Sequence, residues 1–502
     1  MSRRLRILAT IILLLFAVIV AQSANIQFFR APALTASPNN PRNLNPSGQF
    51  PRGEILAANG AVLAFSAKQN SPYFPYRRVY PYGSLTSGVV GYSSPYYGVD
   101  GIEEEYNGLL EAHSQPPQSF EQLLAPTSAA DSVTLTIQPA LQQVARAALK
   151  GIDGAAVAID PKTGAVLVMY SNPNYNPVPL TSPNLTIETA ARHLYLKPDG
   201  NGFEPLGSVA TQQTFPPGST FKVITTAAAV VSKPADLTKS FNSDRGACTT
   251  LPDSNKLLCN SGGQPCGGDV AEMLPPSCDP GYALLGIDLG ADYMFKAATS
   301  FGYNSTPPLD LPNTASSYFP TAASFANNIP GLAYSSIGQE NVRSSALQDA
   351  LVAAAVGNGG VEMTPHLMSF ITGPDGKVIE RYKDSVWKTP LTSTQAQVIV
   401  PLMEKVVTVG TASGVGFPAQ FDVAAKTGTA QTGNAQKNTD DWLIAFAPAT
   451  DPTIAIAVVV PFQPTANFGA TVAGPIVKCL VEGFFAMQAG KNPSVAATGC
   501  QG

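Results

Sequence analysis

An uninterrupted apolar run opens the chain, and positive charge precedes it. Ile7–Ala21 contains no charged residue, and Arg3, Arg4 and Arg6 stand directly before it. Extended to Phe29, the run is long enough to cross a bilayer as a helix. Positive residues stay on the cytoplasmic side of such a helix, so we expect the rest of the chain outside the cytoplasm. A cleaved signal peptide is the alternative, because small residues lie near the end of the run.

Strand patterns follow after a polar stretch. Residues 31–49 are rich in Pro, Asn and Ser and predict a linker. Ile55-Leu56 and Val62-Leu63 flank Asn59-Gly60, a pair that favours the tight turn of a β-hairpin. No long helical pattern occurs from there to about residue 130. We therefore expect a small β-rich domain after the linker.

The apolar segments become longer from residue 155 onward. Strands are predicted at both ends of this region, within 155–169 and 442–460, and apolar helices such as 223–231 and 346–356 lie between them. Strands that frame helices are typical of an α+β fold with a mainly antiparallel sheet. The expected parts of the chain are an anchor with its cytoplasmic tip at 1–30, the linker and β-rich domain at 31–150, the large domain at 151–490, and a tail at 491–502.

Composition narrows the functions to be considered. The 502 residues include 30 Lys and Arg against 34 Asp and Glu, and charged residues make up only 13%. No Lys/Arg-rich face stands out, so we expect no nucleic-acid partner. The chain has 3 histidines, far apart, and no CxxC pair, which leaves little material for a zinc site. A Ser-His-Asp hydrolase is not excluded, but the chain offers few histidines for one.

The six cysteines are informative on an exported chain, because disulfides persist outside the cytoplasm. Four of them cluster between residues 248 and 278, where Cys278 lies inside the candidate site segment Ser277-Cys278-Asp279, and two lie near the C-terminus. Spacing alone does not fix connectivity. From the clustering, we expect Cys266 to pair with Cys278 and Cys248 to pair with Cys259.

The sharpest chemical pattern is the segment Pro216-Pro217-Gly218-Ser219-Thr220-Phe221-Lys222. Prolines before an apolar helical run predict Ser219 in the first turn of a helix, where unpaired N–H groups stabilise a developing negative oxygen. Lys222 lies three residues on and therefore on the same face. A buried lysine near other cations can lose its proton and act as base toward the serine. A capping serine followed by a surface lysine is the structural alternative, since the tetrapeptide alone is a weak signal.

Such a site also needs a basic strand that binds a carboxylate, and Lys-Thr-Gly occurs twice. Lys162-Thr163-Gly164 follows Asp160-Pro161 in a predicted turn and is interpreted as structural. Lys426-Thr427-Gly428-Thr429 follows an apolar segment and lies in a predicted strand. The second copy is therefore the candidate, and the backbone of Thr429 can donate into an oxyanion hole there.

The site further needs a second hydroxyl, usually in a Ser-x-Asn segment before a helix, and this motif has no clean match. Ser277-Cys278-Asp279 precedes the apolar run 282–289 and carries Asp where Asn is expected. Its structural alternative is an N-cap on an ordinary helix. Ser240-Phe241-Asn242 is the next candidate, although it follows the nucleophile closely. Ionised Asp279 beside Lys222 would raise the pKa of that lysine and oppose its role as base.

Together these segments resemble the class B penicillin-binding proteins, and among them the actinobacterial PbpA-type members. The resemblance covers nearly the whole chain and rests on 52–55 and 101–103 in the neck, 157–161, 216–225, 337–339 and 358–360 in the large domain, and the second Lys-Thr-Gly. It implies an α+β fold in which a serine penicillin-recognising transpeptidase domain, an antiparallel sheet flanked by helices, follows an N-terminal membrane anchor and a small β-rich neck. Leu206–Ala210 departs from the Asn-Arg-Ala segment usual in the family, so the loop there is expected to differ.

The resemblance implies a penicillin-binding D,D-transpeptidase that cross-links peptidoglycan. The serine would attack the penultimate D-alanine of a stem peptide, and the amine of a second stem would resolve the acyl-enzyme. The implied catalytic residues are Ser219, Lys222, Ser277, Asp279 and Lys426, and the implied substrate-binding residues are Thr427, Gly428 and Thr429. No metal or organic cofactor is implied.

The resemblance also implies a location and partners. The protein would span the cell membrane once, with its catalytic domain outside, and would bind stem peptides and β-lactams. A SEDS-type glycan polymerase and proteins of division or elongation are the implied partners. A serine β-lactamase shares the motifs but lacks such a neck and anchor. A non-catalytic β-lactam-binding scaffold or sensor, which Asp279 keeps open, and a D,D-carboxypeptidase, which uses water as acceptor, remain alternatives.

Overall fold

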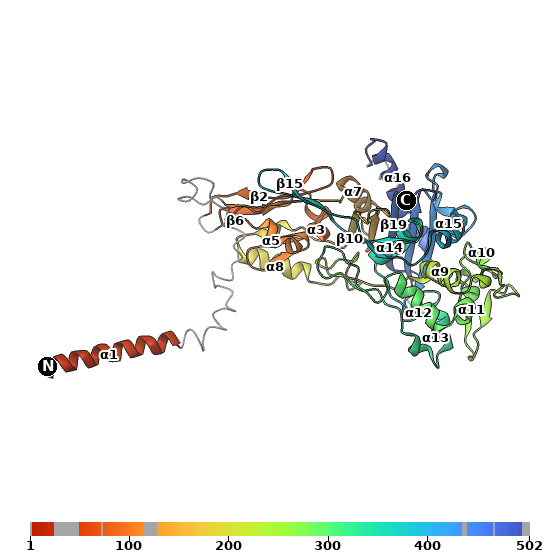
Figure 1. Cartoon of the computed structure of the whole chain (residues 1–502), viewed down its shortest axis with the longest axis horizontal. Helices are drawn as coiled ribbons and strands as arrows, with labels where there is room; N and C mark the ends of the chain where they lie inside the picture. The colour runs from red at the N-terminus through yellow and green to blue at the C-terminus, as the bar shows by residue number, and fades with distance from the viewer. Residues whose placement is uncertain are drawn as a thin grey trace.

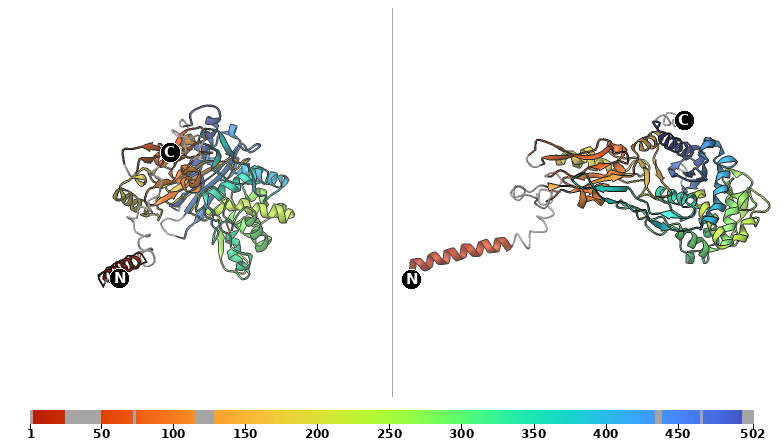
Figure 2. Two further views of the ribbon diagram at one scale, coloured as in Figure 1. Left: turned by 60° about the vertical axis from the view of Figure 1, so that its left-hand side comes forward. Right: turned by 45° about the horizontal axis from the view of Figure 1, so that its top comes forward.

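The computed structural model describes residues 3–24, 50–71, 74–114, 128–433, 439–464 and 467–493. The N-terminal apolar run forms helix α1 (Arg3–Ala24) of 22 residues. The predicted linker at 31–49 lies outside the described residues, as does the predicted tail beyond residue 493. The rest of the chain forms an elongated body, with the strands of the neck at one end and helices α10 to α13 at the other (Figures 1 and 2).

The large domain is built on a five-stranded antiparallel sheet in the order β10-β9-β19-β18-β17. Its strands are β9 (Gly154–Ile159), β10 (Val166–Asn172), β17 (Ala424–Gln431), β18 (Thr439–Ala447) and β19 (Ile454–Gln463). The predicted antiparallel sheet, with strands from both ends of this region, is thereby confirmed. The strands β9 and β19 are largely apolar on both faces because helices cover both sides of the sheet.

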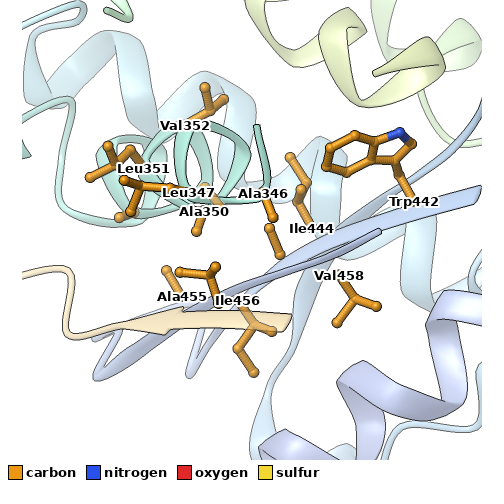
Figure 3. Close-up of a cluster of buried hydrophobic side chains, with 14 of the residues drawn as sticks. Ala346, Leu347, Ala350, Leu351, Val352, Trp442, Ile444, Ala455, Ile456 and Val458 are labelled. Carbon is orange, nitrogen blue, oxygen red and sulfur yellow. The ribbon is translucent and has the colours of Figure 1, made fainter. Parts of the chain in front are cut away.

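Helix α14 (Ala346–Gly357) packs on one face of this sheet, against β9, β18 and β19. Figure 3 shows Ile444 and Ala455 directed toward α14, whereas Ile456 and Val458 point to the opposite face. Helix α16 (Gly469–Gln488) covers that other face together with α7 (Pro139–Ala148). Although α16 has the length and composition of a membrane-spanning helix, half of its apolar window is buried, and we interpret it as a core helix.

A helical lobe stands beside strand β17. Its longer elements are α9 (Lys222–Ser232), α11 (Asp279–Leu289), α12 (Ala291–Ser300), α13 (Ile329–Ser335) and α15 (Ser393–Thr408). Shorter ones are α10 (Val270–Met273), η5 (Gly218–Phe221), η6 (Pro234–Thr238), η7 (Ser261–Gly263), η8 (Ala322–Phe325), η9 (Ser413–Val415), η10 (Ala419–Phe421) and the hairpin β11 (Cys248–Thr250) and β12 (Leu257–Cys259). Because α9 contacts α11, α12 and α15, the segments that carry the candidate motifs meet around one helix.

The neck contains a six-stranded sheet in the order β15-β14-β8-β1-β2-β3. Its strands are β1 (Ile55–Leu56), β2 (Val62–Lys68), β3 (Tyr76–Val79), β8 (Ser132–Leu135), β14 (Met368–Thr372) and β15 (Val378–Arg381). The predicted hairpin is present, since β1 pairs antiparallel with β2 and Gly60 adopts a φ of 79° in the turn. Smaller elements are η3 (Gly83–Leu85), α3 (Ser87–Val90), β4 (Tyr92–Ser94), β5 (Gly98–Asp100), α4 (Ile102–Glu105), α5 (Asn107–Leu110), β6 (His113–Ser114) and β7 (Ser128–Ala129).

The neck sheet and the large domain each include elements from beyond the expected boundary at residue 150. Strands β14 and β15 come from the middle of the expected large domain, yet β14 pairs with β8 in the neck sheet. Helix α7 comes from the expected neck, yet it packs on α16 and β10. Local patterns predict strands and helices but not which distant strand completes a sheet, so these crossings were not predicted. Two strands of the neck sheet therefore come from a part of the chain within residues 151–490.

A buried cluster of charged side chains lies in the core of the neck. Glu103 is fully buried and accepts from Arg52 Nε at 3.0 Å and from Arg78 Nε at 2.5 Å. Burial acts to raise the pKa of Glu103, but Arg78 and Arg52 together hold that pKa below its usual range. The two neck segments that carry the family resemblance, at Arg52 and Glu103, thus contact each other.

The two predicted disulfides are confirmed. Cys248 and Cys259 join opposite positions of β11 and β12, and Cys266 is bonded to Cys278 at the start of α11. Cys500 lies outside the described residues.

Loss of the Cys266–Cys278 bond is expected to lower the free energy of unfolding. Closing a loop of this length removes unfolded-state entropy worth about 3 kcal/mol. We expect Cys266→Ser to shift the urea unfolding curve of the detergent-solubilised full chain by that amount, followed by tryptophan fluorescence. Cys248→Ser serves as the matched control, with a similar cost because its loop is of similar length. An unchanged curve for Cys266→Ser would mean that the bond does not constrain the unfolded chain.

Candidate active site

Ser219 lies in η5, a single 3₁₀ turn that leads directly into α9. Gly218 before it has a φ of 54°, and a side chain there would approach the Thr429 carbonyl carbon to 3.0 Å. The Gly218 N–H donates to the Gly338 oxygen at 2.9 Å. Glycine is therefore required for the turn to lie against β17, which brings the Ser219 hydroxyl beside the second Lys-Thr-Gly strand. The predicted first-turn placement is close to the structure, with a 3₁₀ turn in place of an α-helical one.

Lys222 is the first residue of α9, and its side chain is fully buried. The Nζ atom donates to the Ser277 carbonyl oxygen at 2.7 Å and lies 3.2 Å from the Ser277 Oγ. It also forms an ion pair with the Asp279 Oδ1 at 2.6 Å. The structural alternative of a surface lysine is thus wrong for Lys222.

Ser277 links the three candidate motifs. Its hydroxyl accepts from Lys426 Nζ at 2.8 Å, in addition to its contact with Lys222. Ser277 has a φ of 60°, an uncommon conformation for a residue other than glycine, and it directly precedes the bonded Cys278. Strain of this kind persists only where the surroundings enforce it, and here the disulfide and both lysines hold the residue.

The pKa values of Lys222 and Lys426 are both lowered, but to different degrees. Burial lowers the pKa of Lys222, and the nearby Asp279 carboxylate acts in the opposite direction. Burial lowers the pKa of Lys426 well below its usual range, and the neighbouring charge of Lys222 lowers it further. Two ammonium groups this close to one hydroxyl repel each other, so the pair favours the loss of one proton. The arrangement therefore provides a proton acceptor close to Ser219.

Asp279 accepts on both carboxylate oxygens. Oδ1 faces Lys222 Nζ, and Oδ2 accepts from the Ser261 backbone N–H at 3.1 Å. Asp279 thus faces the cleft as an acceptor, with one oxygen in an ion pair with Lys222.

Strand β17 forms the opposite wall. A side chain at Gly428 would come within 2.6 Å of the Pro217 oxygen, so glycine allows the nucleophile turn and β17 to touch. The Thr427 and Thr411 hydroxyls lie 2.6 Å apart, and the Thr429 hydroxyl accepts from the Gly469 N–H at 3.0 Å. The polar groups of β17 therefore have fixed directions.

One continuous cleft exposes these groups. The lining residues that belong to the candidate motifs are Ser219, Ser277, Asp279, Thr427 and Thr429. Sequence reasoning missed Asn260, Ser261, Thr411 and Phe468, which also line it. Asn260 and Ser261 follow the β11–β12 hairpin, whose position depends on the disulfides, and nothing in the local sequence marks them. No histidine lines the cleft within the part of the chain that the structure describes.

The rejected motif copies lie elsewhere. Lys162 sits in the turn between β9 and β10, where it forms an exposed ion pair with Asp451. Gly164 of the same copy is needed because a side chain would clash with the Thr364 oxygen at 2.2 Å. Asn242 donates to the carbonyl oxygens of Gly246 and Cys266 rather than facing Lys222. Both segments have structural explanations.

Asp279→Asn is expected to speed acylation of the protein by a penicillin at neutral pH by about 1–2 kcal/mol in barrier. The change removes the negative charge that raises the pKa of Lys222, so the lysine is deprotonated at lower pH. The acid limb of the pH–rate profile should therefore move to lower pH, and the wild type should gain activity as pH rises. Stopped-flow acylation by a fluorescent penicillin checks both.

The matched control for this change is Asp288→Asn. Asp288 lies at the other end of α11 and pairs with Lys239 at the surface. Its loss should leave the rate unchanged. Equal rates for Asp279→Asn and the wild type at every pH would remove Asp279 from the site.

Comparison with known families gives two matches that follow each other along the chain. Residues 154–482 match "Penicillin binding protein transpeptidase domain", and residues 52–132 match "Penicillin binding protein A dimerisation domain". The first covers well over half of the chain and includes every candidate site residue.

Curated relatives align with nearly the whole chain. "Peptidoglycan D,D-transpeptidase PbpA" of Mycolicibacterium smegmatis is 34% identical over 477 residues, which cover 92% of this chain and 94% of the relative. The protein of the same name from Mycobacterium tuberculosis is 32% identical over 504 residues, or 96% and 99% of the two chains.

Solved structures are similar over most of the chain. Penicillin-binding protein A from M. tuberculosis, as a ceftriaxone acyl-enzyme complex, superposes with a TM-score of 0.77 at 31% identity, over 86% of this chain and 98% of that one. PBP2 of Pseudomonas aeruginosa in complex with WCK 5153 gives a TM-score of 0.70 at 27% identity, over 88% and 97%.

Proposed function

Since this chain belongs to the class B penicillin-binding proteins and is a serine-type peptidoglycan D,D-transpeptidase, we propose that Ser219 is the nucleophile and Lys222 its base. The observation that carries this assignment is the convergence of Lys222 Nζ and Lys426 Nζ on the Ser277 hydroxyl, next to the turn that bears Ser219. Peptidoglycan stem peptides and β-lactams are its ligands.

The first half-reaction transfers an acyl group to the serine. Neutral Lys222 takes the Ser219 proton as the Ser219 oxygen attacks the carbonyl of the penultimate D-alanine of a donor stem. The backbone N–H groups of Ser219 and Thr429 stabilise the oxyanion of the tetrahedral intermediate. When the C–N bond breaks, the proton held by Lys222 passes through the Ser277 hydroxyl to the departing nitrogen, and terminal D-alanine leaves as the free amino acid.

The second half-reaction forms the cross-link. The amine of an acceptor stem attacks the acyl carbon, gives its proton to Lys222, and Ser219 is released with a proton returned from the same lysine. A new amide bond replaces the ester, so no external energy source is needed. Lys222 therefore acts as the base in both half-reactions.

The Lys-Thr-Gly strand binds the terminal carboxylate of the donor in this proposal. Thr427 and Thr429 present hydroxyls to the cleft, and Lys426 donates to Ser277 and to its neighbour's carbonyl oxygen. A substrate carboxylate near Lys426 would favour its ammonium form, against the burial that lowers its pKa. Gly428 keeps the strand close to the nucleophile turn.

A reaction with defined peptides tests the function. We expect incubation with a D-Ala-D-Ala pentapeptide and an excess of an acceptor peptide with a free amine to release D-alanine and form a cross-linked product, both quantified by mass spectrometry. Hydrolysed tetrapeptide alone would indicate a carboxypeptidase. Penicillin binding without any D-alanine release would indicate the scaffold or sensor, which the ion pair of Asp279 with Lys222 favours.

We further propose that α1 anchors the protein in the cell membrane, with all following domains outside the cytoplasm. The apolar composition of α1, the arginines before it and the disulfides support this orientation. A SEDS-type glycan polymerase and division or elongation proteins are the proposed partners, contacted through the anchor and the neck. Protease accessibility of the large domain in intact cells tests the orientation, because a cytoplasmic domain would be protected.

A further inference from the structure

A buried carboxylate lies behind the nucleophile turn. Asp349 of α14 has 2% of its surface exposed, and three hydroxyl groups face it. Thr220 Oγ donates to its Oδ2 at 2.7 Å, and Ser344 Oγ donates to its Oδ1 at 2.6 Å. The Tyr303 hydroxyl is more distant, at 3.4 Å from Oδ1. No cation pairs with it among the described residues.

These contacts join both ends of the segment that carries Ser219. Thr220 follows the nucleophile directly. Ser344 pairs through its backbone with Phe215, at N···O distances of 2.9 and 2.8 Å. The Asp349 carboxylate thus contacts Thr220, directly after Ser219, and Ser344, whose backbone pairs with Phe215 before the turn.

We infer that Asp349 is a positioning residue for Ser219. The ionised carboxylate of Asp349 accepts from the Thr220 hydroxyl and thereby holds the turn that bears Ser219 against strand β17. The inference rests on the proposed role of Ser219. It requires no contact between Asp349 and the substrate, since Asp349 acts through Thr220.

The competing acceptor of Thr220 shows why ionisation matters. The Thr220 hydroxyl has one proton, and the Pro217 carbonyl oxygen also lies within reach, at 3.0 Å. An ionised Asp349 only accepts, so it takes this proton. When Asp349 is protonated on Oδ2, that oxygen donates to the Thr220 hydroxyl, and the Thr220 proton turns toward Pro217. Because the Pro217 oxygen faces Gly428, this exchange alters the contact between the turn and β17.

The charge of Asp349 changes within an accessible pH range. Burial raises the pKa of Asp349 to about 6, and the hydroxyl donors Ser344, Thr220 and Tyr303 oppose that rise. Tyr303 and Glu362 are the titratable groups nearby, and burial raises the pKa of each well above its usual range. Asp349 is therefore mostly ionised at pH 7.5 and mostly protonated at pH 5.

The change in melting temperature caused by Asp349→Asn distinguishes a positioning role from a purely structural role. A carboxyl whose pKa rises on folding destabilises the fold when ionised, fully above its folded pKa and not at all below its unfolded pKa. Removing this charge with Asp349→Asn should therefore leave the melting temperature at pH 7.5 unchanged or higher. A purely structural residue would show the opposite.

The test is acylation of the detergent-solubilised full chain by a fluorescent penicillin between pH 5 and 8.5. We expect Asp349→Asn to acylate about tenfold more slowly at pH 7.5, since small misplacement of a reacting group costs one to two orders of magnitude. Its acid limb near pH 6 should disappear, because asparagine does not titrate. The part of the pH–rate profile that reflects deprotonation of Lys222 should remain.

Two further variants make the test specific. Thr220→Val removes the hydroxyl and should match Asp349→Asn, and the double variant should be no slower than either single one. Ser344→Ala removes a different donor, which should raise the pKa of Asp349 and move the limb to higher pH.

Wild-type rates and profiles for both Asp349→Asn and Thr220→Val would overturn the inference. So would a slow Asp349→Asn with a lowered melting temperature beside a normal Thr220→Val. Ser219→Ala is measured in parallel: labelling that persists there would refute the proposed nucleophile instead, so the two failures are distinguishable.

Discussion

Ser219→Ala is expected to abolish covalent labelling by a fluorescent penicillin while the protein remains folded. The Ser219 hydroxyl makes no hydrogen bond to the rest of the described chain, so its removal should cost no more than the ~1 kcal/mol typical of a lost helix-start serine. Without this oxygen no ester can form, and the label should be lost entirely after denaturing electrophoresis.

Ser324→Ala is a suitable control for this result. Ser324 lies in η8, is exposed, and donates only to the Thr321 oxygen. It should label at the wild-type rate. Labelling of Ser219→Ala above background, at equal folding by circular dichroism, would show that another residue is the nucleophile.

Lys222→Ala should slow acylation about 10³-fold, within the range for loss of a general base. Lys222→Arg should be equally slow, because arginine stays protonated and cannot accept the serine proton. This pair separates a role in proton transfer from a role of the positive charge alone. Time-resolved labelling over hours gives both rates.

Lys222→Ala leaves the Asp279 carboxylate without its partner in a partly buried site, which itself destabilises the fold. The double variant Lys222→Ala with Asp279→Asn removes the stranded charge and should be equally inactive. Lys162→Ala, in the exposed copy of Lys-Thr-Gly, is the matched control and should react normally. Near-normal acylation by the folded double variant would mean that the base lies elsewhere.

Local sequence was sufficient for the elements whose geometry is set by neighbouring residues. Asn59-Gly60 indicated the hairpin, and the prolines before Ser219 indicated the entry into α9. The two cysteine pairs followed from proximity along the chain. In each case the interacting groups are separated by few residues, so their contact does not depend on the rest of the fold.

The pairing of strands that lie far apart in the sequence could not be predicted from local patterns. The addition of β14 and β15 to the neck sheet depends on strands more than two hundred residues apart, whose apolar patterns carry no information about their partner. For the same reason Ser261 and Thr411 were missed, since each enters the cleft only through the fold. Asp349 lies in an apolar helical run, and its three hydroxyl partners come from segments scattered between residues 220 and 344.

Asp279 shows what sequence could state and what it could not. Its neighbours predicted a carboxylate near Lys222, and the 2.6 Å contact bears that out. The contact of its second oxygen with the Ser261 N–H depends on the fold and was not predicted.

Mapping the penicillin adduct on the wild-type protein tests the central claim most directly. The full chain is labelled to completion, digested, and the modified residue is located by tandem mass spectrometry. The proposed function predicts one adduct, on Ser219, with a mass that shows the opened β-lactam ring. An adduct on any other residue, or saturable binding that leaves Ser219 unmodified, would contradict it.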